Sequence, residues 1–126
     1  MSVQARKMRT GQVAYLAGAA AEAQVAQDYE RRGFTILRRR WRGKGGEIDL
    51  IARDGDGLIF IEVKASRDFD RAARRLGARQ MARLCTSAEE FLGTQPGGAL
   101  TDMRFDVALV DGTGAVRIIE NAFDQG

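Results

Sequence analysis

The chain has 126 residues, of which 44% are hydrophobic and 29% are charged, and its formal net charge is +3. This length and composition predict one cytoplasmic globular domain, 1–126, because no segment has the apolar run of a membrane span or a secretory signal. The chain has no histidine and one cysteine, which excludes histidine-based triads, histidine-ligated metal nucleases and an intramolecular disulfide.

A helix is the first predicted element and runs from Thr10 to Arg32. Thr10 can cap its first turn, and Gly33 follows two arginines at its end. Glu22 shares a face with apolar residues in the second half of this helix, so we expect Glu22 to point toward the body of the protein. Residues 1–9 form a basic N-terminus that precedes the helix and that can be disordered.

The remaining elements are five strands and a second helix. β-branched and aromatic residues between turn signals predict strands over 34–41, 47–53, 58–64, 104–110 and 116–119. An apolar stripe predicts a helix over Arg71–Leu92, and Gln80 lies on that stripe. The predicted order is therefore αβββαββ, which belongs to the α/β class.

Basic residues are unevenly distributed, and most of them are arginine. Arg31–Lys44 holds seven positive residues and no acid, whereas from Thr86 onward there are seven acids and two arginines. This asymmetry predicts one surface that faces a polyanion, because the guanidinium group suits phosphate; the alternative is solvated faces with local ion pairs. The candidate nucleic-acid-binding residues are Arg38, Arg40, Arg42, Lys44, Arg75, Arg79 and Arg83. Trp41, among the arginines, would either stack on an unpaired base or belong to the core.

The segment GEIDLIARDGDGLIFIEVK places acids and a lysine inside two predicted strands. A turn centred between Gly55 and Asp56 sets Asp49 opposite Glu62. The same register makes one face of the hairpin wholly apolar, from the pair of Ile48 and Val63 to the turn. Glu47 then lies opposite Lys64 on the face that carries the acids, which we expect the helix bearing Glu22 to cover.

Two opposed carboxylates repel each other unless a cation lies between them. Asp49 and Glu62 therefore predict a site for Mg²⁺ or Mn²⁺, which take carboxylate oxygens, water and substrate phosphate as ligands. Lys64, on the same face, would orient the attacking water or neutralise charge that develops on the phosphate. The alternative is a solvated strand face on which Glu47 and Lys64 form an ordinary ion pair.

These residues, with the RRRWRGKGGE approach and the later RFDVALV and IENAF segments, resemble the YraN-like family of small bacterial proteins. That family in turn is similar to the Holliday junction resolvase branch of the PD-(D/E)xK nuclease superfamily. The resemblance implies a restriction-endonuclease-like fold, with a mixed central sheet flanked by helices. It also implies that Asp49 and Glu62 are metal ligands and that Lys64 is the catalytic lysine.

The resemblance further implies that Glu22 is a catalytic residue that joins the metal site, and that Gln80 and Glu47 support it. Two alternatives stay open: Glu22 as a buried or rim glutamate paired with an arginine, and Gln80 as a partner of the backbone. We therefore expect a Mg²⁺- or Mn²⁺-dependent endonuclease that acts on structured or single-stranded DNA in repair or recombination. The alternative is a catalytically silent nucleic-acid-binding module that works with a partner. Paired cuts at a symmetric junction would require two active sites and hence a homodimer.

Overall fold

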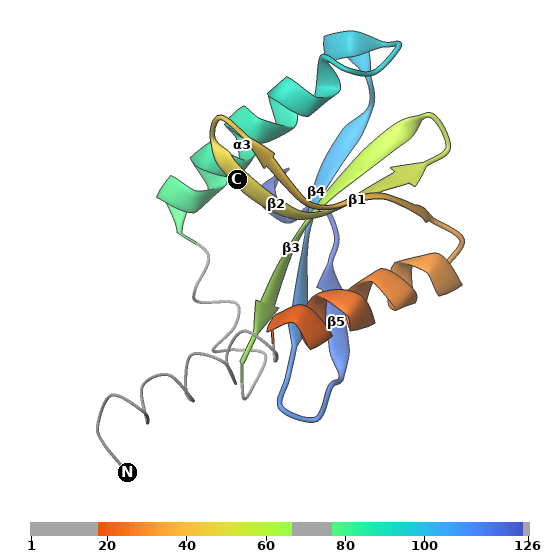
Figure 1. Ribbon diagram of the computed structural model, residues 1–126, viewed down its shortest axis with the longest axis vertical. Helices are drawn as coiled ribbons and strands as arrows, with labels where there is room; N and C mark the ends of the chain where they lie inside the picture. The colour runs from red at the N-terminus through yellow and green to blue at the C-terminus, as the bar shows by residue number, and fades with distance from the viewer. Residues whose placement is uncertain (1–17, 67–76, 125–126) are drawn as a thin grey trace.

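A computed structural model describes residues 18–66 and 77–124 of the protein (Figure 1). Within these ranges the order of helices and strands is the predicted αβββαββ, with two short 3₁₀ helices added. The elements are a helix over 18–31, β1 (Thr35–Gly43), β2 (Gly46–Asp54), β3 (Gly57–Ala65), α3 (Ala78–Leu92), η1 (Gly98–Leu100), β4 (Met103–Val110), β5 (Val116–Ile119) and η2 (Ala122–Asp124). Neither described helix is long and apolar enough to cross a membrane.

The five strands form one mixed sheet in the order β1-β2-β3-β4-β5. The pairs β1–β2, β2–β3 and β4–β5 are antiparallel, and β3 pairs with β4 in parallel. A parallel pair requires a long connection between its strands, and the segment that contains α3 makes it here. The prediction of an α/β domain with a mixed sheet is confirmed.

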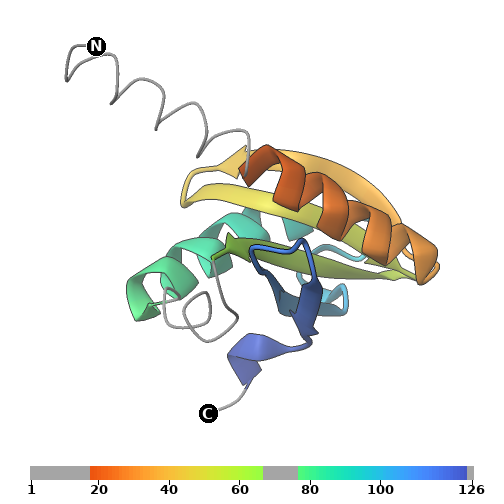
Figure 2. The same ribbon diagram turned by 90° about the horizontal axis from the view of Figure 1, so that it is seen from below.

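The two helices lie on opposite faces of the sheet, as Figure 2 shows. Helix 18–31 buries one side of its surface against β2, β3 and β4; we call this the first core. Its buried residues are Ala21, Val25, Ala26, Tyr29, Leu50, Ala52, Ile59, Ile61, Ala108 and Val110. The other face packs against α3 and forms the second core, with buried residues Ile48, Ile51, Leu58, Phe60, Leu84, Ala88, Phe91, Leu92 and Phe105.

The start of α3 differs from the prediction. Gly77 has φ −102° and ψ 164°, an extended conformation, and caps a helix that begins at Ala78. The helix therefore does not run continuously from Arg71, because the periodic stripe that predicted it is interrupted at a residue with low helix propensity. Residues 71–76, which include the candidate Arg75, lie outside the described residues, as does the predicted cap at Thr10.

The faces of the β1–β2 hairpin also differ from the prediction. Ile48 was expected on the same face as Leu50, but Ile48 belongs to the second core and Leu50 to the first. At the same level of the ladder, Arg40 of β1 has a φ of 51°, in the left-handed region, so the alternation of side chains is irregular on β1 as well. Trp41, next along β1, consequently turns onto α3 and packs edge-on against Phe91, as its core interpretation predicts.

The turn between β1 and β2 lies directly against α3. Ser87 donates a hydrogen bond of 2.8 Å to the carbonyl of Gly46, and the backbone N–H of Lys44 donates one of 2.7 Å to Glu90. A Cβ added to Gly45 would meet the Arg83 carbonyl oxygen at 2.5 Å, which is closer than contact allows. A glycine at this position is therefore a condition for docking the hairpin.

Replacing Gly45 with alanine should lower the free energy of unfolding by about 1–3 kcal/mol, because backbone on both sides must move apart. Urea unfolding followed by circular dichroism measures this loss. The matched control is Gly18→Ala in helix 18–31, where an added Cβ meets no atom of the described residues within 4 Å. That variant should be unchanged or slightly more stable, and equal effects of the two substitutions would contradict the close contact at Gly45.

Candidate active site

The predicted register of β2 and β3 is the observed one. Leu50 pairs with Ile61, Ile51 with Phe60, and the ladder continues to the turn. At the neighbouring residue of β2, a side chain replaces the backbone as the acceptor: Asp49 Oδ2 accepts a hydrogen bond of 2.8 Å from the N–H of Val63. Asp49 is thereby fixed beside Glu62.

Glu62, Lys64 and Gln80 form a closed triangle of polar contacts. Glu62 Oε1 accepts a hydrogen bond of 2.7 Å from Gln80 Nε2 and lies 3.2 Å from Lys64 Nζ. Lys64 Nζ in turn donates to Gln80 Oε1 at 3.3 Å. The described bonds of Gln80 thus go to two side chains of β3, and α3 supplies the residue that aligns them.

Burial and mutual repulsion define the electrostatics of the carboxyl pair. Desolvation first, and then the charge of Glu62, raises the pKa of Asp49 to about 7, although the hydrogen bond from Val63 opposes the shift. Burial also raises the pKa of Glu62, against the attraction of the Lys64 ammonium. The two carboxyl groups influence each other's pKa, as neighbouring carboxyl groups that can share a proton do.

A divalent cation fits this pair, because it would replace the shared proton and remove the repulsion. Mg²⁺ commonly uses one or two carboxylates and keeps several waters, so Asp49 and Glu62 are a sufficient protein donor set. A third carboxylate does not join them: within residues 18–66 and 77–124 no three acidic, histidine or cysteine side chains are grouped to hold a metal.

Glu22 lies near the carboxyl pair, since its charge is one of the causes that raise the pKa of Asp49. Its helix covers the first core, whereas the face of Ile51, Phe60 and Glu62 is covered by α3. Glu22 Oε2 accepts a hydrogen bond of 2.8 Å from Arg40 Nε. This contact agrees with the alternative interpretation of Glu22, an acid paired with an arginine, while its role in the metal site stays a prediction. The pattern of the helix predicted that Glu22 turns inward but carried no signal for its partner, which is distant in the sequence.

Glu47 does not pair with Lys64 as the regular register suggested. The β2–β3 ladder ends at Leu50, before it reaches Glu47; on the other side of β2, Glu47 pairs with Arg42 of β1, and its side chain is exposed. Glu47, Gln80 and Arg83 help to line a cavity of about 130 Å³ between the β1–β2 turn and α3. Glu47 is thus placed at the rim, on the side from which α3 supports the carboxyl pair.

The described candidates for nucleic-acid binding lie on β1, on its turn and on α3. These residues are all exposed, and they are Arg38, Arg40, Arg42, Lys44, Arg79 and Arg83. Arg38 packs its guanidinium 6.0 Å from the centre of the Phe91 ring, which ties the two elements together. The hairpin and α3 therefore present basic groups on both sides of the Glu47 cavity.

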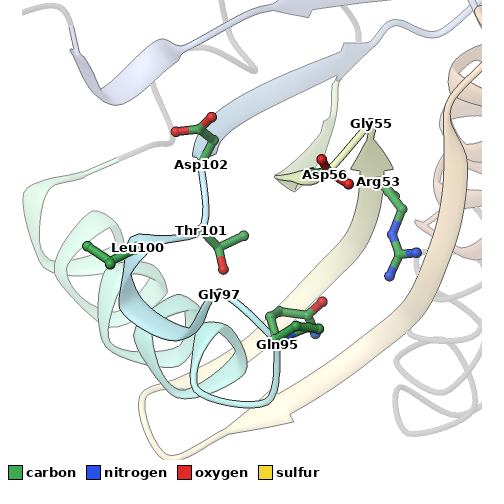
Figure 3. A pocket seen from close by; sticks show the side chains of 9 residues that line it. Arg53, Gly55, Asp56, Gln95, Gly97, Leu100, Thr101 and Asp102 are labelled. Carbon is green, nitrogen blue, oxygen red and sulfur yellow. The ribbon is translucent and has the colours of Figure 1, made fainter.

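A larger cavity, about 380 Å³, lies at the other end of the hairpin. Figure 3 shows Arg53 and Asp56 on one side of it, and Gln95, Thr101 and Asp102 on the other. Asp56 is in the β2–β3 turn, several residues along the strands from the carboxyl pair. This cavity is therefore separate from the candidate site.

Comparison with known proteins supports a family relationship over most of the chain. Residues 21–110 match a family described as "Uncharacterised protein family UPF0102". A UPF0102 protein of Ruegeria pomeroyi is 66% identical over 112 residues, which cover 89% of this chain and 91% of the relative. A UPF0102 protein of Roseobacter denitrificans is 49% identical over 95% of this chain and 93% of its own length. A third, from Cereibacter sphaeroides, is 57% identical over 90% and 97% respectively.

Proposed function

The chain belongs to the UPF0102 family, and we propose that it is a metal-dependent nuclease that hydrolyses phosphodiester bonds in structured or single-stranded DNA. The observation that carries the proposal is the half-buried Asp49 next to the buried Glu62, with Lys64 held beside Glu62. Burying two adjacent acids costs free energy, so a fold that keeps them close is best explained by a ligand that uses both.

The chemistry follows from the donor set. Mg²⁺ or Mn²⁺ held by Asp49 and Glu62 would supply a Lewis acid and an activated water. Lys64 is anchored by Glu62 and Gln80, and its ammonium can donate to a substrate oxygen and stabilise negative charge that develops there. Gln80 acts by keeping Glu62 and Lys64 in one relative position.

The fold supports the same proposal. Two acids on adjacent antiparallel strands, a lysine two residues after the second acid, and a helix on each face of a mixed sheet are consistent with a restriction-endonuclease-like domain of the PD-(D/E)xK superfamily. The exposed arginines of β1 and α3 would bind the phosphate backbone on either side of the acids. The proposed setting is DNA repair or recombination in the cytoplasm.

Replacing Lys64 with methionine should lower the rate of DNA cleavage about 10²-fold, because the substitution keeps the length of the side chain and removes its donor. Single-stranded, flap and four-way-junction DNA, each with Mg²⁺ or Mn²⁺, are the substrates to compare. Glu47→Gln is the control, since it removes an exposed acid from the same region, and its rate should change little.

Undiminished cleavage by the Lys64→Met protein would refute the proposed site. Salt-sensitive DNA binding by the wild-type protein without cleavage of any substrate would instead favour the second candidate, a silent binding module. The pairing of Glu22 with Arg40, which offers that carboxylate a partner other than a metal ion, is the observation that favours this candidate.

A further inference from the structure

The cavity of about 380 Å³ at the β2–β3 turn lies at the far end of α3 from the carboxyl pair. Helix α3 is roughly 20 Å long, and Gln80, which contacts Glu62, is in its first turn. Gln95, which lines the cavity, follows the last turn of the same helix. The cavity therefore belongs to a surface remote from the candidate site and from the arginines at the start of α3.

Exposed apolar side chains gather at this end of the molecule. Leu100, on the rim of the cavity, is 92% exposed. The other exposed large hydrophobic residue of the described ranges is Met103, which lines an adjoining cavity of about 410 Å³. Asp56 lies in the walls of both cavities. The large apolar side chains that the described residues leave to water are thus neighbours of one turn.

Hydrogen bonds hold the segment that carries Leu100 in one conformation. The N–H of Leu100 donates to the Gly97 carbonyl at 3.1 Å. The N–H and the hydroxyl of Thr101 donate to the Gly98 carbonyl at 3.1 and 2.8 Å. Gly98 has a φ of 54°, a left-handed conformation that glycine adopts without strain. Because the segment is already ordered, covering Leu100 with a partner would cost little conformational entropy.

Opposite charges stand beside the cavity without partners. Arg53 and Asp56 are exposed and lie on the same side of it (Figure 3). Within residues 18–66 and 77–124, neither side chain has an ion-pair partner. Asp54, also exposed, is next to them, so this end is unsuited to a polyanion such as DNA.

We call Arg53, Asp56, Leu100 and the cavity beside them the tip surface. It combines an apolar projection with a hollow, and a positive charge with a negative one. A surface that holds both members of each complementary pair can match a copy of itself across a two-fold axis, because each contact then occurs twice. The occupant that fits the tip surface is therefore a second copy of this chain.

We propose that the tip surface is the contact of a homodimer. Leu100 of each protomer enters the cavity of the other, and Arg53 of each protomer pairs with Asp56 of the other. One apolar anchor in a polar surround makes a weak dimer, with an expected Kd of about 1–100 µM. The inference does not depend on nuclease activity. Since the tip surface is remote from the carboxyl pair, both pairs stay accessible in the dimer.

Sedimentation equilibrium of the full chain, without DNA or metal, tests the dimer over a range of about 1–300 µM. The mass of the wild type should rise from 13.8 kDa toward twice that value. Leu100→Ser should weaken dimerisation by about tenfold or more, because the anchor is lost from both halves of the interface. Leu100→Met keeps the apolar volume and should stay within about threefold of the wild type.

Charge reversal tests the exchange of Arg53 and Asp56. Arg53→Asp and Asp56→Arg each set like charges against one another twice, so each variant alone should dimerise about tenfold more weakly or worse. An equimolar mixture of these two variants should regain dimerisation, since both contacts between the unlike chains join opposite charges. Arg117→Asp reverses an exposed charge on β5 and should leave the dimer unchanged.

Three results would overturn the inference. They are a wild type that stays monomeric at every concentration, a dimer indifferent to Leu100→Ser, and a mixture of the charge-reversed variants that dimerises no better than its components. Circular dichroism establishes that each variant is folded, and recovery in the mixture shows that both charge-reversed chains keep their surfaces.

DNA binding distinguishes a second copy from nucleic acid as the occupant. In EDTA, at protein concentrations below the Kd of the dimer, Leu100→Ser should bind a labelled single-stranded oligonucleotide as tightly as the wild type does. Weaker binding by this variant would assign the tip surface to DNA and would overturn the dimer. Because none of these measurements depends on cleavage, failure of the proposed nuclease and failure of the dimer are separate outcomes.

Discussion

Replacing Asp49 with asparagine is expected to lower DNA cleavage about 10³-fold or more while making the metal-free protein more stable at pH 8. Cleavage falls because asparagine lacks the charge that a divalent cation requires from its ligand. Stability rises because the substitution removes a buried charge that Glu62 repels. Asparagine can still accept the hydrogen bond from Val63 through its side-chain oxygen, so the local geometry is kept.

The size of the stability effect follows from linkage. The pKa of Asp49 is raised from 3.8 to about 7, so the folded protein holds a proton that the unfolded chain releases between these values. Stability therefore decreases as pH rises through this window, and the loss is complete above it. The full shift corresponds to at most about 4 kcal/mol, and coupling to Glu62 reduces the share that asparagine recovers.

Urea unfolding in EDTA at pH 4 and pH 8 measures this effect. The gain of Asp49→Asn over the wild type should be large at pH 8 and small at pH 4. At pH 4 the folded protein is protonated at this position, and the unfolded chain, with a pKa of 3.8, gains little free energy by releasing the proton. Glu47→Gln replaces an exposed acid two residues before Asp49 on β2, and this variant should show no such pH dependence. An equal gain in the free energy of unfolding at the two pH values would mean that Glu62 and burial do not disfavour the Asp49 carboxylate.

Replacing Asp106 with alanine is expected to lower the free energy of unfolding by about 3–5 kcal/mol. Asp106 is 1% exposed and lies at the centre of a network that joins three parts of the fold. Its carboxylate accepts hydrogen bonds from the Tyr29 hydroxyl at 2.7 Å and from the N–H of Asn121 at 3.0 Å, and it lies 3.1 Å from Arg104 Nε. Alanine would leave the buried Tyr29 hydroxyl and the partly buried Arg104 side chain without this acceptor, which costs more than the lost bonds themselves.

Chemical unfolding of Asp106→Ala beside Tyr29→Phe and Asp102→Ala tests this role. Tyr29→Phe removes one donor and leaves the other partners in place, so it should cost about 1 kcal/mol. Asp102 is exposed, and its replacement should stay within about 0.5 kcal/mol of the wild type. Loss of less than about 1 kcal/mol in Asp106→Ala would contradict the structural role. Near-wild-type cleavage by folded Tyr29→Phe protein would show that the network is separate from the active site.

The local features of the candidate site were predictable from the sequence because they depend on strand alternation. Apolar residues at every second position and a glycine-containing turn determine the pairing of Leu50 with Ile61, and the position of Asp49 next to Glu62 follows. The separation of Lys64 from Glu62 is fixed by the same period of two. The order of the elements and the mixed sheet also agreed with their predicted pattern.

Contacts between elements were predicted less well. The helix that carries Glu22 covers the opposite face from the one expected, since a sheet with two apolar faces does not specify which helix covers which. The irregular alternation of side chains at Arg40 accompanies a left-handed backbone conformation. Arginine rarely adopts this conformation, and no local residue preference predicts it. The triangle of Gln80, Glu62 and Lys64 required the docking of α3, whose true start at Ala78 the apolar stripe did not reveal.

By itself, then, the sequence determined which residues form the carboxylate hairpin, because hydrogen-bond register and side-chain alternation are local properties of two joined strands. Only the tertiary structure decided that Glu62 is buried and Asp49 half-buried, that Gln80 contacts Glu62 and Lys64, and that Glu22 pairs with Arg40. The physical reason is that burial, pKa and long-range ion pairs depend on the sheet twist and on the helices that cover it, and these arise from packing between segments far apart in the chain.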